Sequence, residues 1–434
     1  MKILIICNDY PPLNTVAAER PLGWVQHLPA LGFQLTVITK DWKGPETDPR
    51  AWIFGKASQQ TREESPSVTI IRVPNKMTPT DWMIRKWGWN TAGTLRKAFT
   101  FLWNAGSFFS DTFDRHAHLH AAAKDYLQSH PVDLILATAN PWQNFRHAAR
   151  LSKTFDIPWV ADYRDGWYLS QETIRRKGWV HRLVRALEWN RENKFVRTAA
   201  AITTASPALS DFYSFLLEKP AYTVYNGFRD LPQNMLDTHG PAKLVMVHNG
   251  TLKPTQDIEF LLDAMDVLWQ QGKMKPGDLE LRMVGLEHFP DQAQRVRNYK
   301  PHLADFITLT PRLSRDQSMA QIQHADVLIA LSDPYFQAIY TKVIEYIAVQ
   351  RPIWVIPDDR GLMRNLVENL GQGAVFQQVN DLAKAIQQAI NDPQALRKET
   401  YREEAASFFS RKHQASVMAD ALKEVYAHSK GLRG

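Results

Sequence analysis

Short apolar runs separated by longer amphipathic stretches dominate the pattern in the first half of the chain. The stretch 19–31 has helical periodicity and lies between the first two runs. Strands that alternate with helices predict βαβ units and a mainly parallel sheet. The runs that we interpret as buried strands span residues 2–7, 32–39, 68–73, 133–138, 158–165, 199–206 and 221–227.

The second half repeats this pattern, with helical stretches at 258–272 and 381–392 between its apolar runs. Together the two halves predict two doubly wound α/β domains, at residues 1–228 and 229–408. A last helical stretch, within residues 409–434, is expected to pack back on the first domain. The predicted strands of the second domain span residues 244–250, 279–285, 306–311, 325–332 and 352–357.

A helical insertion at about residues 77–125 interrupts the alternation in the first domain. Tryptophan beside lysine and arginine is typical of a membrane interface, where indoles lie at headgroup level and cations meet anionic lipid. The alternative is an insertion that packs on its own domain. A second basic stretch, 174–197, predicts a helix for which a solvated face is the simpler interpretation. The residues that give the insertion its character are Trp82, Trp87, Trp89, Trp103, Arg85, Lys86, Arg96 and Lys97.

The charge of the chain favours an anionic partner, because the formal net charge is +7 and the pI about 9.2. The candidates are nucleic acid, an anionic membrane surface and a phosphorylated ligand. No nucleic-acid module is recognisable, and the basic residues lie with helices and tryptophan clusters. We therefore expect no nucleic-acid partner.

The single cysteine, Cys7, lies in an apolar run and leaves no second cysteine for a disulfide within the chain. This fits a reducing compartment. No run approaches the roughly 18–20 apolar residues of a spanning helix, and the run after Lys2 is too short for the core of a signal peptide. These features predict a cytoplasmic protein.

Phosphate-binding motifs and metal motifs are both weak in this sequence. The glycine-rich turn of dinucleotide-binding domains is missing after the first strand of either half, and so is a GxxxxGK[ST] loop. The histidines at 116, 118 and 120 suggest metal ligands, but only His116 and His120 share a helix face. A solvated helix is the interpretation that we favour, and no metal site is predicted.

Two strand ends carry candidate chemistry. The segment ADYRDGWY crowds Asp162, Arg164 and Asp165 at the end of a strand, either facing a ligand or closing an internal ion-pair network. The segment HNGTL places Gly250 at the end of another strand, where Lys253 and backbone amides either meet a phosphate or form a plain turn.

The segment TKVIEYIAVQRPIWVI places Lys342 and Glu345 three residues apart in a short predicted helix. Residues at this spacing share one face. They form either a surface ion pair worth a few tenths of a kcal/mol or part of a ligand site.

Together these segments resemble the family-4 glycosyltransferases, which have the GT-B architecture of two facing Rossmann-like domains with a cleft between them. The resemblance spans nearly the whole chain and rests on the order and spacing of its motifs. It implies an enzyme that transfers a sugar from a nucleotide-sugar to a glycan or lipid-linked acceptor, with retention of anomeric configuration and without a metal. Cell-surface polysaccharide synthesis on the inner face of the cytoplasmic membrane fits this activity. The motifs are NDYPP, Arg20, DYRDGW, TTASPALSDFY, YNGF, HNGTL and TKVIEYIAVQRPIWVI.

The resemblance also implies roles for residues in the second domain. Glu345 matches the glutamate that accepts hydrogen bonds from the nucleotide ribose, while Gln337 stands where a glutamate usually contacts the donor sugar. A related subgroup carries a lysine three residues before the ribose-binding glutamate, as Lys342 does here. That lysine and the helix start at Thr341 suit a diphosphate.

Two positions depart from the family pattern. Thr251 and Gln256 stand where many members have an arginine and a lysine on the diphosphate. Lys253 and Lys342 are expected to take over that charge as the catalytic cations, with Gly250 and Thr251 beside the donor.

In the first domain, Asn14, Arg20 and Arg164 are expected to line the acceptor side, with Asp165 as a further catalytic residue. The tryptophan-rich insertion would bring the site to a membrane-borne acceptor. The alternative function is a non-catalytic GT-B subunit that binds or scaffolds a glycan assembly complex, which the two departures would favour.

Overall fold

The chain forms two compact units in a computed structural model. Unit 1 comprises Met1–Asn226 and Gln414–Gly434, and unit 2 comprises Gly227–His413. The predicted domain limits at residues 228 and 408 lie close to these divisions. The structure describes residues 1–13, 15–42, 59–88, 93–109, 113–167, 178–229, 243–333, 339–393, 396 and 406–431.

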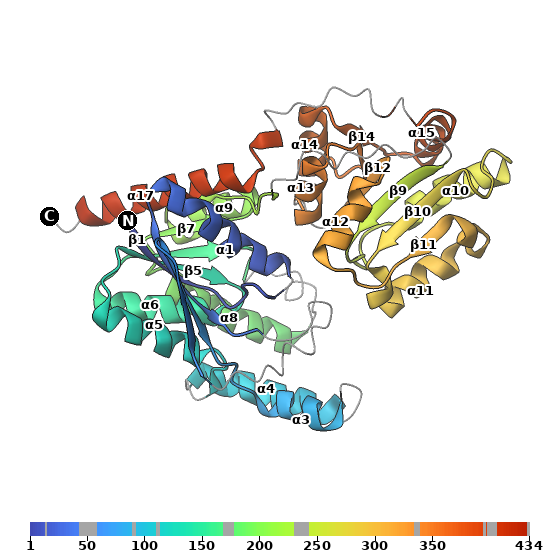
Figure 1. Ribbon diagram of the computed structural model, residues 1–434. Coiled ribbons are helices and arrows are strands. Elements are labelled where there is room, and N and C mark those ends of the chain that lie inside the picture. The colour runs from blue at the N-terminus through green and yellow to red at the C-terminus, as the bar shows by residue number, and fades with distance from the viewer. Residues whose placement is uncertain are drawn as a thin grey trace. The chain divides into compact units, whose positions relative to one another are not determined.

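Unit 1 is built on an eight-stranded sheet with the order β3-β4-β2-β1-β5-β6-β7-β8 (Figure 1). All neighbouring strands pair in parallel except β3, which pairs antiparallel with β4 at the edge. The inner strands are continuous apolar runs because both faces of the sheet are covered. The strands are β1 (Lys2–Ile6), β2 (Gln34–Lys40), β3 (Thr61–Glu64), β4 (Val68–Val73), β5 (Leu134–Ala139), β6 (Trp159–Tyr163), β7 (Ala201–Thr204) and β8 (Ala221–Thr223).

Helices cover both faces of this sheet and form two core layers. One layer holds side chains of α5, α6 and α9, such as Leu119, Phe145 and Tyr213. The other holds side chains of α1 and α17, such as Trp24 and Met418. The helices of unit 1 are α1 (Val16–His27), η1 (Leu28–Leu31), α3 (Pro79–Trp87), α4 (Gly93–Phe109), α5 (Ala117–Ser129), α6 (Gln143–Phe155), α8 (Trp179–Val196) and α9 (Pro207–Leu217).

Helix α17 (Arg411–Gly431) begins in unit 2 and runs along unit 1. Its residues Met418 and Leu422 are buried in the same core layer as Ile5. The hydroxyl of Tyr426 donates to Asp133 Oδ1 at 2.9 Å, which ties the helix to the segment before β5. The C-terminal segment thus completes the core of unit 1.

Unit 2 is built on a six-stranded, fully parallel sheet with the order β11-β10-β9-β12-β13-β14. The strands are β9 (Leu244–Asn249), β10 (Leu279–Val284), β11 (Ile307–Leu309), β12 (Val327–Leu331), β13 (Ile353–Ile356) and β14 (Gly373–Val375). The helices are α10 (Glu259–Gln270), η4 (Leu286–His288), α11 (Pro290–Tyr299), η5 (Pro301–Phe306), α12 (Arg315–Gln323), α13 (Thr341–Ala348), α14 (Leu362–Leu370) and α15 (Val379–Asn391).

The α/β class that the hydrophobic pattern predicts is confirmed in both units. The first helix differs in its start, since α1 begins at Val16 and continues as η1 to Leu31. Within the basic stretch 174–197, α8 leaves Trp179 73% exposed, so its surface is not only a solvated charged face. Within the described residues, no helix is long and apolar enough to cross a bilayer.

Candidate functional site

Polar side chains gather where β9 ends in unit 2, and His248 is the buried centre of this group. Its Nδ1 lies 3.1 Å from the carbonyl oxygen of Ile329 on β12. Because a carbonyl only accepts, Nδ1 carries the proton and Nε2 is left as an acceptor. Burial, followed by the charge of Lys342, lowers the pKa of His248 to about 3, so the imidazole is neutral at physiological pH.

Lys342, the second residue of α13, donates from Nζ to two neutral acceptors. These are Nε2 of His248 and the carbonyl oxygen of Thr251, each at 3.1 Å. Burial lowers the pKa of the Lys342 amine to about 7, and repulsion from Lys253 contributes. A nearby anion would therefore stabilise the charged form of Lys342.

The turn after β9 adds a second cation. Gly250 adopts a φ of +94°, which a residue with a side chain rarely adopts, and its N–H donates to Val284 at 2.9 Å. The Nζ of Lys253 lies 4.8 Å from the ring centroid of Tyr340. Thr251 is exposed, and its carbonyl is the group that holds Lys342.

Gln256 has a structural role in this turn. The side chain is buried, and its Nε2 donates to the carbonyl oxygen of Leu331 at 2.8 Å. Its Oε1 accepts from the backbone N–H of Lys253 at 2.9 Å. The amide thus fastens the turn to the end of β12, at the position where the resemblance places a lysine on the diphosphate.

Glu345 lies one turn after Lys342 on α13 but has a different partner. Nη2 of Arg315, the first residue of α12, lies 2.8 Å from Oε1 of Glu345. Both side chains are largely buried. These contacts orient Lys342 toward β9 and Glu345 toward α12, which favours the ligand-site interpretation over a simple surface ion pair.

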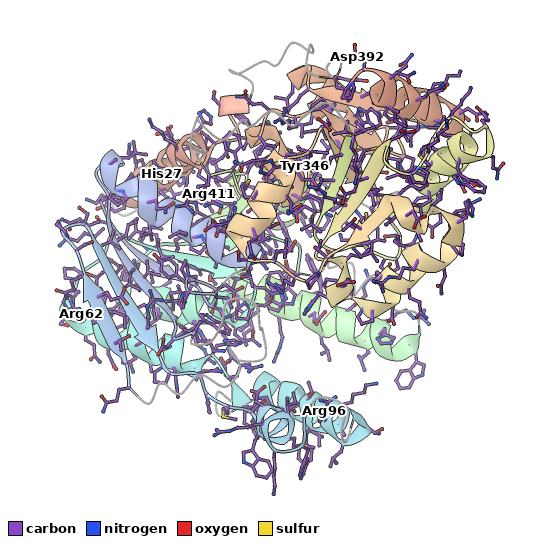
Figure 2. The ribbon with its side chains drawn as sticks, turned by 45° about the vertical axis from the view of Figure 1, so that its right-hand side comes forward. His27, Arg62, Arg96, Tyr346, Asp392 and Arg411 are labelled. Carbon is purple, nitrogen blue, oxygen red and sulfur yellow. The ribbon has the colours of Figure 1, made fainter. Side chains whose placement is uncertain are left out.

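Tyr346 fixes α13 against the end of β9 (Figure 2). Its hydroxyl accepts from the backbone N–H of Asn249 at 2.8 Å, and the side chain of Asn249 accepts from Ser318 at 2.8 Å. The end of β9 is thereby held by two helices. A site built on such contacts is preorganised.

The start of α13 adds to the positive charge of this region. Its N-cap residue, Tyr340, makes no side-chain cap, and Thr341 is the first helical residue. A helix N-terminus carries a partial positive charge and favours anions. Lys253, Lys342 and this helix end therefore bring positive charge together next to an oriented carboxylate.

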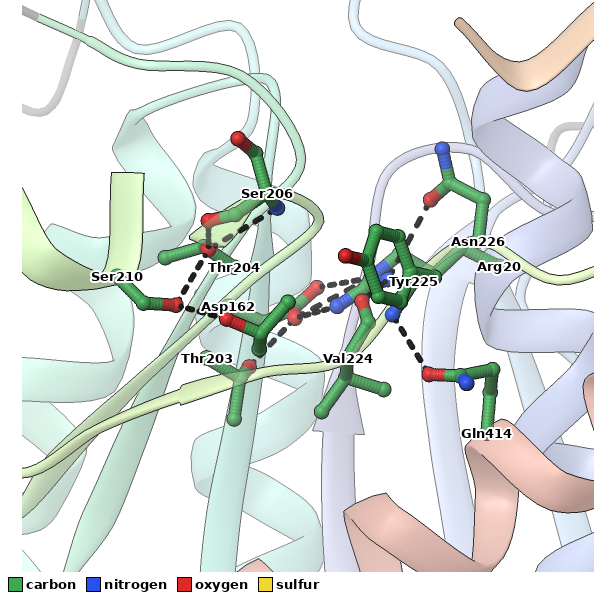
Figure 3. A network of polar contacts seen from close by, with 11 residues as sticks. Arg20, Asp162, Thr203, Thr204, Ser206, Ser210, Val224, Tyr225, Asn226 and Gln414 are labelled. Carbon is green, nitrogen blue, oxygen red and sulfur yellow. Dashed lines mark hydrogen bonds and ion pairs between the residues drawn. The ribbon is translucent and has the colours of Figure 1, made fainter. Parts of the chain in front are cut away.

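In unit 1, Arg20 lies in a buried network rather than on an open surface (Figure 3). Its guanidinium forms an ion pair with Asp162 at 2.7 Å and donates to the carbonyl of Val224 at 2.5 Å and to Asn226 at 3.3 Å. Thr203 donates to the same carboxylate at 2.6 Å. For Asp162, the internal ion-pair network is therefore the correct interpretation.

Arg164 and Asp165 follow β6 and are more accessible. Nε of Arg164 lies 3.3 Å from Asp165, and Nη1 lies 3.8 Å from Asp9, which lies three residues after the end of β1. The Asp165 side chain is 67% exposed. Burial raises the pKa of Asp9, and the charge of Arg164 opposes that shift. Two further predicted residues, Asn14 and Gln337, lie outside the described residues.

The prediction of a solvated helix at the three histidines is wrong for His116. This residue is buried at the N-cap of α5, where its backbone N–H donates to Asp114 at 2.8 Å. Arg146 and His147 also donate to Asp114, at 2.5 and 2.8 Å. Among the described residues, no three His, Cys, Asp or Glu side chains come together as a metal site requires.

His248 and Arg315 are two residues of this group that the sequence patterns did not predict. His248 lies inside the HNGTL motif, yet that motif led to a prediction only for Gly250 and Lys253. Arg315 lies 30 residues before its partner Glu345, and no local pattern joins them. The histidine could have been found, because a polar residue within the apolar run LVMVHN requires a buried partner.

Comparison with known families finds a match within the second unit. Residues 237–407 match the family described as Glycosyl transferases group 1. A comparison with curated proteins finds no significant match.

Solved structures with a similar fold cover the whole chain. Sucrose-phosphate synthase from Thermosynechococcus elongatus has a TM-score of 0.64 at 18% identity, over 99% of this chain and 100% of that one. HepE from Anabaena, solved with UDP and glucose, has a TM-score of 0.58 at 17% identity, over 98% and 100%. An α,α-trehalose 6-phosphate synthase from Burkholderia multivorans has a TM-score of 0.60 at 13% identity, over 100% of both chains.

The likeness to these structures shows the GT-B fold, and the group 1 domain shows the class of enzyme. The chain is a glycosyltransferase with the GT-B fold. The comparisons give no support to the alternative of a non-catalytic scaffold.

Proposed function

We propose that the protein transfers a sugar from a nucleotide-sugar to a glycan or lipid-linked acceptor, as a family-4-like enzyme that retains anomeric configuration. The observation that supports this best is the arrangement on α13. A cation held by neutral acceptors, Lys342, and a carboxylate held by an arginine, Glu345, lie one helical turn apart. This pair suits a ligand that joins a diphosphate to a ribose.

In the proposed complex, the diphosphate lies at the start of α13. Lys253 and Lys342 would neutralise it, with Gly250, Thr251 and Thr341 beside it. Glu345 would accept hydrogen bonds from the ribose hydroxyls, and its contact with Arg315 would keep the carboxylate in place. Gln337 would contact the donor sugar through its amide. UDP in the similar HepE structure agrees with a nucleoside diphosphate as ligand.

Catalysis would rest on charge. When the bond from the anomeric carbon to the diphosphate breaks, negative charge develops on the leaving oxygen. In the proposed complex the ammonium groups of Lys253 and Lys342 would lie at that oxygen and stabilise the charge that develops on it. We therefore propose a transfer that needs no metal ion, since these cations would perform the task of a divalent metal.

For the acceptor side we propose residues of unit 1. Asn14, Arg164 and the exposed Asp165 would contact the acceptor, and Arg20 would support them from inside the unit. The setting that we propose is cell-surface polysaccharide synthesis on the cytoplasmic face of the membrane. A lipid-linked acceptor would agree with the basic and aromatic surface of the insertion in unit 1.

Calorimetric titration tests the donor site directly. The full chain is titrated with UDP, GDP, ADP and their common sugar conjugates. We expect the nucleotides of one base to bind with a micromolar Kd. Glu345→Gln should weaken that binding by about tenfold or more, because a neutral amide holds ribose hydroxyls less strongly than a carboxylate does.

The matched control is Glu287→Gln, since Glu287 also pairs with an arginine in unit 2 but lies in η4. The Glu287→Gln variant should bind the nucleotide with the same affinity as the unmodified chain. Absence of binding to every nucleotide by the folded protein would contradict the proposal.

A further inference from the structure

We propose that α3 and α4 of unit 1 form a docking face for an anionic lipid bilayer. This inference extends the proposed function, because a lipid-linked acceptor would be met at this face, but binding to lipid requires no donor and is tested separately. We define the docking face as Trp82, Trp87, Leu95, Ala98, Phe99 and Leu102 with the cations Arg85 and Lys86.

Helix α4 exposes the stripe that an amphipathic helix normally buries. Leu95, Ala98, Phe99 and Leu102 occupy positions i, i+3, i+4 and i+7, which place them on one face. In a globular protein such a face covers a core, yet all four are exposed here, Leu102 to 62%. The stripe is therefore open to an apolar partner as far as the described residues of unit 1 extend.

Helix α3 lies beside α4 at one end of unit 1 (Figure 1). The two helices are linked by the hydroxyls of Thr80 and Thr100, 3.1 Å apart. Trp82 is 51% exposed, and its ring meets that of Trp87 edge to face at a centroid distance of 5.9 Å. The pair adds two large amphipathic rings to the apolar stripe, and indole rings favour the headgroup level of a bilayer.

The charge of the docking face selects an anionic surface. Between residues 79 and 109 the only acidic residue is Asp81, which is buried and paired with Arg115 at 2.8 Å. The exposed charges of α3 and α4 are therefore all positive. Arg96, which Figure 2 labels on α4, is a further cation of this segment.

The cations and the rings are arranged as a bilayer interface requires. The Lys86 ammonium lies 5.0 Å from the Trp82 ring and 5.7 Å from the Trp87 ring. A lysine over an indole can direct its ammonium to headgroup phosphates while the ring enters the boundary with the acyl chains. A protein partner would need acidic and apolar groups in one fixed pattern, whereas an anionic bilayer offers both everywhere.

Vesicle flotation of the full chain is the test. Vesicles of phosphatidylcholine alone are compared with vesicles of phosphatidylcholine and phosphatidylglycerol at about three to one, without nucleotide. We expect binding to the anionic vesicles that weakens as salt is raised and is much lower with phosphatidylcholine alone. The triple substitution Leu95→Ser, Phe99→Ser and Leu102→Ser should reduce vesicle binding by at least about tenfold.

A charge variant keeps the test independent of apolar substitutions. Arg85→Gln with Lys86→Gln should lower binding to anionic vesicles, whereas Lys86→Arg should retain it. Phe215→Ser is the matched control for the apolar triple, since Phe215 is 86% exposed on α9 outside the docking face. Nucleotide titration of every variant should match the unmodified chain, which separates this inference from the donor site.

Three results would overturn the inference. The first is equal binding of the apolar triple and the unmodified chain to anionic vesicles. The second is loss of binding in the Phe215 control to the same extent. The third is a dimer of the unmodified chain, seen by light scattering, that is lost in the apolar triple variant, together with no vesicle binding by any variant. In that case the partner of the docking face would be a second copy of the chain.

Discussion

Arg20 in unit 1 is a buried cation and Lys342 in unit 2 a partly buried one, and their partners differ in charge. Arg20 is held by the carboxylate of Asp162, which is itself fully buried. Lys342 is held by a neutral imidazole and a carbonyl. The first charge is balanced inside the fold, whereas the second is oriented by groups that do not cancel it. This difference separates a structural cation from one prepared for an anionic ligand.

The largest effect is expected from Arg20→Met. It leaves Asp162 buried without its counter-ion and should cost about 3–5 kcal/mol in the free energy of unfolding. Urea denaturation followed by circular dichroism measures this loss. Arg62→Met is the control, because the Arg62–Glu64 pair is solvent-exposed and should contribute less than about 1 kcal/mol. Equal losses for the two variants would remove the distinction between the two kinds of cation.

Lys342→Met should change the stability of the fold little and the affinity for the donor strongly. Removal of a cation from a poorly solvated place and the loss of two hydrogen bonds should offset each other to within about 2 kcal/mol of stability. Donor affinity should fall by about 100-fold, or roughly 2.7 kcal/mol, since the diphosphate loses a preorganised charge. Calorimetric titration measures the affinity. Lys243→Met is the control, because Lys243 precedes β9 at the amino end of the strand and pairs with Glu280.

The pH dependence of donor binding sharpens the comparison. The Lys342 pKa is about 7 in the free protein, and a bound diphosphate would raise it. Above pH 7 the amine must then take up a proton on binding, so affinity should fall by up to about tenfold per pH unit as pH rises. Titration in two buffers of different ionisation enthalpy measures the proton uptake. If the Lys342→Met variant takes up the same number of protons on binding the nucleotide, the proton binds to a group other than Lys342.

The smallest effect is expected at His248, which acts through Lys342. His248→Leu removes the acceptor for the ammonium and should weaken nucleotide binding by about five- to tenfold, or roughly 1 kcal/mol. His248→Gln keeps an acceptor near the position of Nε2 and should restore most of the affinity. The pH profile of binding should shift in the leucine variant, which a purely structural role would not produce. Identical profiles for both variants would contradict the positioning role.

The sequence predicted the elements with strong apolar patterns and missed those without them. Strands β1, β5 and β9 are built mainly from apolar residues and lie where the pattern placed them. Strand β3 reads TREE, is exposed throughout and offers no alternation to detect. Strand β14 has three residues and begins with Gly373, where an added Cβ would meet the carbonyl oxygen of Ile353 at 2.0 Å. This close contact and a φ of +134° both require a glycine at this position.

The candidate site shows the same limit. The spacing of Lys342 and Glu345 brought both residues to one helix face, and the structure keeps them there. Their partners could not be predicted, because His248 and Arg315 come from β9 and α12 and meet α13 only through the fold of the unit. The structural role of Arg20 could not be predicted either, because its partner Asp162 lies 142 residues away in the sequence.

Helix α17 has a consequence for the order in which the chain matures during synthesis. The ribosome releases most of unit 1 first, but Met418 and Leu422 fill its core only after unit 2 has emerged. Domains generally fold as they are synthesised, the N-terminal one first. Here all strands of unit 2 are synthesised before the core of unit 1 is complete. The part of the first sheet that Met418 and Leu422 cover in the folded protein therefore gains this cover only when translation has reached α17.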